Sequence, residues 1–179
     1  MRSRIAGALA GLTLTLAASA AMAQQAGTET ECVSAKTAWS VCIWNEPKEC
    51  WGVAKPSESL NARDGKPVSA RRGDILLFVT FRPGTGAAGE VSFTGGYPFA
   101  PNSTVRLDIG DTGFDLFTDP KQPEFAWTTP EQDASILAAL KGGSSAVVSA
   151  RSARGTQTKD TFSLSGFTAA MSEAETRCK

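Results

Sequence analysis

The chain has 179 residues, of which 41% are hydrophobic, with 18 basic residues, 18 acidic residues and no histidine. Without an imidazole, it cannot use Ser-His-Asp or Cys-His catalysis, a histidine zinc site or a histidine pH switch. Its balanced and interspersed charges argue against a nucleic-acid binder, because phosphate affinity comes from clustered lysine and arginine. An enzyme built on this chain would need carboxylates, a lysine base, or a metal held by oxygen ligands.

The first 23 residues have the organisation of a secretory signal peptide. Arg2 and Arg4 precede an apolar run, 5–18, that is too short to span a bilayer, and Ala21-Met22-Ala23 forms a cleavage site. Cleavage before Gln24 would remove these two arginines and no acid, which leaves 156 residues with 16 basic and 18 acidic side chains. The remaining chain has no second long apolar run, so we predict an exported protein, periplasmic or secreted and envelope-associated, with no transmembrane segment.

The mature chain is long enough for one domain, which would bury roughly 70% of its unfolded surface without depending on disulfides. We expect an N-terminal segment over 24–36 and a β domain over 37–179. Short apolar or alternating runs, separated by Gly, Pro, Asn and Asp, predict strands at 38–44, 49–54, 75–81, 90–94, 104–109, 114–118, 146–150 and 158–164. The turn sequences IGDTGF and SARGTQ predict antiparallel hairpins, and the fold class is mainly β, an antiparallel sandwich or barrel-like domain.

Two helices interrupt the predicted strands. The segment 129–143 has Pro130 in its first turn, apolar residues at helical spacing, and a Gly142-Gly143 stop, which predicts a short internal helix. In 165–178, apolar residues recur every three or four positions, which predicts a C-terminal helix packed on the sheet. The polar stretch 56–72 is expected to be an exposed loop.

Three short motifs invite functional interpretation, and each is better explained by structure. Asp111-Thr112-Gly113 spells the aspartic protease tripeptide, but that mechanism needs two such loops and the chain has one. Arg72-Gly73-Asp74 spells an integrin-binding tripeptide, but it runs into the buried-looking strand ILLFVTF and is expected to end a loop. A cluster of acids does not match the ligand spacing of a calcium loop, and two of its members are expected on a solvent-facing strand surface: Asp108, Asp111, Asp115 and Asp119. We therefore predict no catalytic, cofactor-binding or metal site.

Four cysteines, Cys32, Cys42, Cys50 and Cys178, follow the signal peptide, and an even count in an exported chain favours two disulfides. A hairpin across Asn45-Glu46-Pro47 would set Cys42 opposite Cys50, with Trp51 and Val53 on the core face. Geometry alone thus favours a Cys42–Cys50 bridge and a Cys32–Cys178 bridge. Four cysteines allow three connectivities, so the alternatives stay open.

An ordered set of segments from about Trp39 to Cys178 resembles the invasion-associated locus B family of Gram-negative exported proteins. The segments are RRGDILLFVTFRP, GEVSFTGGYPF, FDLFTD, FAWTTPEQDASILAALKGG, SARGTQTKDTFSLSGFTAA and the terminal RC. The resemblance implies a periplasmic or envelope-associated β-rich domain, without catalytic residues or a cofactor to carry over. It also implies a Cys50–Cys178 bridge that pins the terminal helix to the first hairpin, with Cys32–Cys42 as a local addition.

These observations favour a non-enzymatic binding or accessory protein of the envelope. Its partner would be an envelope or host protein or glycan, and the family name links it to host-cell interaction. The alternative is a carboxylate-dependent hydrolase or carbohydrate-active enzyme, which would need a cleft with two carboxyl groups about 5–9.5 Å apart.

Overall fold

The structure is a computed structural model that describes residues 31–179, so the predicted signal peptide and residues 24–30 lie outside the described part. Twelve strands and two helices make up the described chain. They are β1 (Glu31–Lys36), β2 (Trp39–Asn45), β3 (Lys48–Ala54), β4 (Glu58–Arg63), β5 (Lys66–Pro67), β6 (Leu76–Arg82), β7 (Ala87–Thr94), β8 (Val105–Ile109), β9 (Thr112–Asp119), β10 (Gln122–Trp127), α1 (Pro130–Gly142), β11 (Ser145–Arg151), β12 (Gln157–Ser163) and α2 (Phe167–Arg177).

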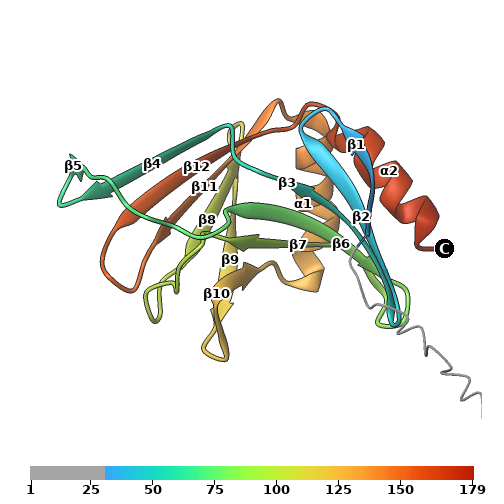
Figure 1. The fold of residues 1–179 in the computed structure, drawn as a ribbon, viewed down its shortest axis with the longest axis horizontal. Coiled ribbons are helices and arrows are strands. Elements are labelled where there is room, and N and C mark those ends of the chain that lie inside the picture. The colour runs from blue at the N-terminus through green and yellow to red at the C-terminus, as the bar shows by residue number, and fades with distance from the viewer. Residues whose placement is uncertain (1–30) are drawn as a thin grey trace, which may run out of the picture.

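The strands form a single open sheet in the order β1-β2-β3-β6-β7-β10-β9-β8-β11-β12-β4-β5. Every pairing in it is antiparallel. This confirms the mainly β antiparallel class with an internal and a C-terminal helix. The sheet curls around its core, with β1 at one edge and β5 at the other, and Figure 1 shows β4 and β5 at the opposite end of the molecule from α2.

The core lies on the inner face of this curled sheet. Val79 and Phe93 come from one half of the sheet, Leu107 and Phe162 come from the other, and all four side chains are fully buried. The rings of Phe93 and Phe162 meet edge to face, with centroids 6.1 Å apart, although their strands are far apart in the sheet order. Ile136 of α1 and Met171 of α2 belong to the same apolar cluster, so both helices contribute to one core.

The helices begin and end where the sequence predicts. Pro130 occupies the first turn of α1, Glu131 and Asp133 follow it, Lys141 lies in the last turn, and the helix ends at Gly142. On α2, the buried side chains Phe167, Ala170, Met171 and Ala174 recur at helical spacing, so one face packs on β2 and β3. No helix within residues 31–179 is long and apolar enough to cross a membrane.

Four strands were not predicted, and the expected loop at 56–72 is wrong in part. β4 and β5 form a hairpin at the sheet edge, and β4 pairs with β12. The side chains of β4 are mostly exposed, so they show no alternation between apolar and polar residues. β10 contains Pro123 and Glu124, and β1 lies in the stretch expected as an N-terminal segment; each nevertheless pairs with strands of the sheet.

The register of the first hairpin differs by one residue from the predicted one. Asn45 pairs with Lys48 across a two-residue turn, Glu46-Pro47, so Trp51 and not Cys50 lies opposite Cys42. Because strand side chains alternate between faces, this shift places Cys50 in the core and turns Trp51 and Val53 to the outer face. The predicted core positions of Trp51 and Val53 are therefore wrong, and so is the geometric argument for a Cys42–Cys50 bridge.

The cysteines are joined as Cys50–Cys178 and Cys32–Cys42, the pairing that the family resemblance implies. The first bridge attaches the end of α2 to β3, and the second joins β1 to β2. Disulfides persist in oxidising surroundings, so both bridges indicate an extracytoplasmic location.

Candidate ligand-binding pocket

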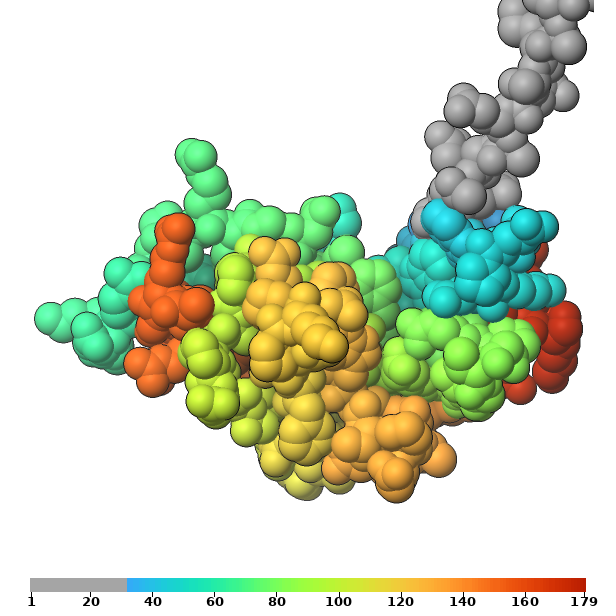
Figure 2. All heavy atoms as spheres, turned by 90° about the horizontal axis from the view of Figure 1, so that it is seen from below, coloured from blue at the N-terminus to red at the C-terminus, as the bar shows by residue number. Residues whose placement is uncertain are grey.

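A pocket of about 510 Å³ lies beside β12 and β4, at the end of the sheet opposite the strands that α2 covers. Its wall comes from five segments: the β4–β5 hairpin, the loop 68–75, the loop after β7, β10, and the β11–β12 hairpin. Figure 2 shows the β4–β5 region and the β11–β12 hairpin gathered at one end, with α2 and the first strands at the other. We call these the pocket end and the α2 end.

The inner face of β12 changes from apolar to polar as it approaches the pocket. Phe162 is fully buried in the core, and Asp160 and Thr158 follow it on the same face with exposed fractions of 0% and 5%, while Thr156, just before the strand, is 6% exposed. Strand alternation puts the three side chains of β12 in one row, and Thr156 follows at its end. The row therefore leads from the core to the pocket wall, where Thr156 and Thr158 take part in the lining.

A buried ion pair lies beneath the pocket. Arg72, from the loop 68–75, donates through Nη1 and Nη2 to the two carboxylate oxygens of Asp160 at 2.7 and 2.5 Å. The side chain of Arg72 is 6% exposed and that of Asp160 is 0% exposed. Two charges so far from water are tolerated only when they are paired and hydrogen-bonded, and Arg72 Nε also donates to the Gly95 carbonyl at 2.8 Å.

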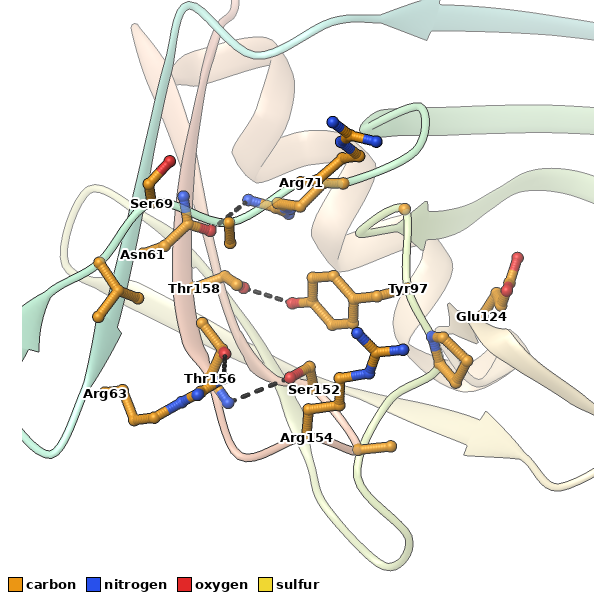
Figure 3. A pocket seen from close by; sticks show the side chains of 16 residues that line it. Asn61, Arg63, Ser69, Arg71, Tyr97, Glu124, Ser152, Arg154, Thr156 and Thr158 are labelled. Atoms are coloured by element: carbon orange, nitrogen blue, oxygen red, sulfur yellow. Dashed lines mark hydrogen bonds between the residues drawn. The ribbon is translucent and has the colours of Figure 1, made fainter.

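Tyr97 completes this network from the loop after β7. The Arg72 guanidinium carbon lies 5.0 Å from the centroid of the Tyr97 ring, a cation–π contact, and the Tyr97 hydroxyl shares a short hydrogen bond with Thr158. Figure 3 shows the ring standing across the pocket toward Thr158. Burial raises the pKa of the Tyr97 hydroxyl above its ordinary value, against the opposing effects of Thr158 and Arg72, so the phenol is neutral at physiological pH.

Three arginines other than Arg72 line the wall. Arg63 at the end of β4 donates from Nη2 to Thr156 Oγ1 at 2.8 Å, while Arg71 and Arg154 are exposed on two different loops. One carboxylate, Glu124, joins them in the lining, and Figure 3 places it across the pocket from Arg63. The wall also has hydroxyl, amide and small apolar groups, so it can contact both polar and apolar parts of a ligand.

Comparison with known proteins places this chain in a family. The family described as invasion associated locus B (IalB) protein matches residues 64–175. The chain belongs to the IalB family. The match contains Arg71, Arg72, Tyr97, Arg154 and Asp160, whereas Arg63 and all four cysteines lie outside it.

The fold of this IalB protein is also found in a solved structure, described as the crystal structure of invasion associated protein B from Bartonella henselae. The two chains are 17% identical, with a TM-score of 0.53 over 83% of this chain and 96% of the other. At this identity the likeness concerns the fold alone. No curated protein matches the sequence significantly.

The three motifs considered from the sequence do not meet in this pocket as an active site. Gly110 and Asp111 form the turn between β8 and β9, where Gly110 has a φ of 57°, which confirms the predicted turn. Asp108 and Asp115 both accept from Arg106 at 3.0 Å on an exposed surface, as expected for solvent-facing positions. No group of acids or cysteines suited to a metal occurs within residues 31–179.

Arg72-Gly73-Asp74 does end a loop before a strand, as expected, but its arginine has a role that the sequence did not reveal. Arg72 is turned inward to Asp160 and is not displayed at a loop tip. None of the pocket residues was identified from the sequence. The available signal was the presence of arginines in two connections, SARRGD and SARGTQ, but nothing local shows that these connections meet.

Proposed function

We propose that this IalB protein is an exported, non-enzymatic binding protein of the cell envelope and that the pocket beside Tyr97 holds its ligand. The observation that carries the proposal is the construction of this pocket. Five segments distant in sequence form the wall, and a buried network of Arg72, Asp160, Tyr97 and Thr158 joins three of them, which fixes the wall before any ligand arrives. A preformed wall lowers the ordering cost of binding.

The chemistry of the wall favours binding over hydrolysis. Carboxylate-dependent hydrolases use two acids about 5–9.5 Å apart, whereas this wall has one, Glu124. Asp160, the acid beneath the wall, is held by Arg72 in a bidentate pair and has no exposed side-chain surface. We therefore expect purified protein to be inactive toward glycoside and peptide substrates.

The location follows from the predicted signal peptide and the two disulfides. We propose that the mature protein begins at Gln24 and lies in the periplasm or at the envelope, where oxidation of thiols is supported. The relative from Bartonella henselae is described as invasion associated, so contact with a host protein or glycan is part of the proposal.

The test fills the pocket without disturbing the network. Ala153 is exposed and lines the pocket, so Ala153→Trp should block it, whereas Gln157→Trp puts the same side chain at an exposed position of β12 outside the lining. Small molecules extracted from the envelope should shift the NMR signals of Tyr97 and Thr158 in the wild type and in Gln157→Trp, but not in Ala153→Trp. Equal responses in all three proteins, or no response at these residues, would contradict a ligand site here.

A further inference from the structure

The arginines of this IalB protein fall into two groups, and the groups lie in different places. Within residues 31–179, four arginines form ion pairs with carboxylates: Arg72, Arg82, Arg106 and Arg177. The other four form none with described residues: Arg63, Arg71, Arg151 and Arg154. Three of these unpaired arginines line the pocket, and Arg151 lies on the same hairpin as Arg154. The unpaired arginines are therefore concentrated at the pocket end.

This concentration is local, because the whole chain is balanced at 18 basic and 18 acidic residues. Glu124 offsets one of the three lining arginines. Asp160 offsets none of them, since Arg72 occupies both of its oxygens. Among the residues that line the pocket, three unpaired arginines therefore stand against one carboxylate, Glu124, so the lining keeps an excess of positive charge.

Two of these arginines are placed to contact one ligand. Arg63 is attached to the wall through its bond to Thr156, which leaves its other guanidinium donors available. Arg154 lines the same pocket, and Figure 3 shows its side chain on the side where Ser152 lies. Guanidinium groups bind carboxylates and phosphates through paired N–H donors, more strongly than neutral donors do.

The size and mixed character of the pocket exclude a bare ion as its natural occupant. A volume of about 510 Å³ lies in the range of small-molecule sites and is far larger than one phosphate needs. Val68, Ala70 and Pro98 offer apolar surface beside the hydroxyls of Ser69 and Ser152. These groups fit a compact organic molecule that has both hydroxyl groups and carbon surface.

We infer that the pocket binds a small organic anion, a carboxylate- or phosphate-bearing molecule of about one or two sugar rings, with Arg63 and Arg154 contacting the anionic group. This inference rests on the proposed function and adds the chemical class of the ligand. The attraction is between charges near solvent, so binding weakens as the ionic strength rises.

The test uses the oxidised, full-length exported protein and four probes: digalacturonate, glucose 6-phosphate, uncharged lactose and inorganic phosphate. Calorimetry should show binding of digalacturonate or glucose 6-phosphate at millimolar concentration, at least tenfold tighter than lactose, and NMR should place it at Tyr97 and Thr158. Whichever of the two anions binds identifies the charged group. Arg63→Gln and Arg154→Gln should each weaken binding about tenfold or more.

The matched control is Arg151→Gln, which removes an unpaired arginine of the same hairpin that does not line the pocket. It should change the affinity less than threefold.

Lactose binding as tightly as the anions, or unchanged affinity in the Arg63 and Arg154 variants, would overturn the anionic class while leaving a ligand pocket in place. Binding of inorganic phosphate as tight as that of either organic probe would overturn the organic ligand. Absence of any pocket response to all four probes would overturn the inference, and the Ala153→Trp experiment decides separately whether the pocket is a site.

Discussion

At the α2 end, the inner face of the sheet is apolar and a helix covers it. At the pocket end, the same side of the sheet carries Thr156, Thr158 and Asp160, and loops cover it. Trp39 of β2 meets Phe167 of α2 edge to face at 4.9 Å, with both side chains 1% exposed. The pocket end has instead the buried pair of Arg72 and Asp160, with an open cavity above it. The inner face of one sheet is therefore covered in two ways. At the α2 end it is covered by apolar packing and a disulfide, and at the pocket end it is covered by loops around a buried ion pair, which leave room for a ligand.

The largest effect should come from opening the bridge at the α2 end. Cys50→Ser with Cys178→Ser removes a cross-link between residues 128 apart in sequence, which should lower the free energy of unfolding by about 5 kcal/mol in the chain-entropy description. Cys32→Ser with Cys42→Ser opens a separation of 10 residues and should cost about 3 kcal/mol. Denaturant unfolding of both double variants measures the difference, and equal losses would show that the long bridge adds nothing beyond the short one.

At the pocket end, the corresponding change is Asp160→Asn. It leaves the buried Arg72 without a compensating charge, which should cost about 3–5 kcal/mol. Asp115→Asn is the control, because Asp115 is half exposed in its pair with Arg106 and should cost under about 1 kcal/mol. Thermal or denaturant unfolding compares the two, and similar losses would mean that burial of the Arg72 pair has no consequence for stability.

A pair of glycines compares the two ends at similar backbone geometry. Gly166, before α2, has a φ of 85° and Gly155, in the β11–β12 hairpin, has a φ of 81°. A Cβ at Gly166 would collide with the Lys36 carbonyl oxygen, whereas at Gly155 the nearest atom is Arg151 Nη2 at 3.8 Å. Both alanine variants bear the strain of positive φ, so the collision should make Gly166→Ala about 1–3 kcal/mol more destabilising than Gly155→Ala. Equal melting temperatures would contradict the close docking of α2 on β1.

The smallest effect concerns a surface contact of α2. Hydrogen bonds from Lys36, followed by those from Arg177, lower the pKa of Glu173 from 4.5 to about 2. A carboxylate whose pKa is lowered by folding stabilises the folded state at any pH above its pKa in the unfolded chain. For Glu173 this contribution is lost as the pH falls from about 4.5 to about 2. The free energy of unfolding of Glu173→Gln should therefore change less with pH in this window than that of the wild type. Denaturant unfolding at several pH values, followed by circular dichroism, measures the difference. Glu175→Gln, whose partner is Lys179 at 3.5 Å, is the control and should retain the wild-type dependence.

The sequence predicted those parts of the fold that depend on local patterns. Alternation identified β8 and β11, and helical spacing with Pro130 and the following glycines identified α1. The strand β4 was missed because its side chains are mostly exposed, and the turn at Glu46-Pro47 was assigned one residue too many. A single-residue error in a turn reverses the faces of a strand, which is why Trp51 was placed in the core.

The pocket could not be predicted because its contacts are distant in sequence. Arg72 and Asp160 are 88 positions apart, and Arg63 and Thr156 are 93 apart. Strand alternation puts Asp160 on the same face as Phe162, but nothing in the residues around it identifies Arg72 as its partner. The pocket also depends on the pairing of β12 with β4. The sequence did not predict β4, because its side chains show no alternation between apolar and polar residues.

The bridge between Cys50 and Cys178 also has a consequence for damage to the chain. A protease that cuts once in any loop between these two residues leaves two fragments that the disulfide still joins. The β6–β7 turn at 83–86 and the β11–β12 turn at 152–156 both lie inside this interval and contain exposed residues. A protein nicked at either turn would migrate as one species until it is reduced, so backbone cleavage outside the cytoplasm would not by itself release β1, β2 and β3 from α2.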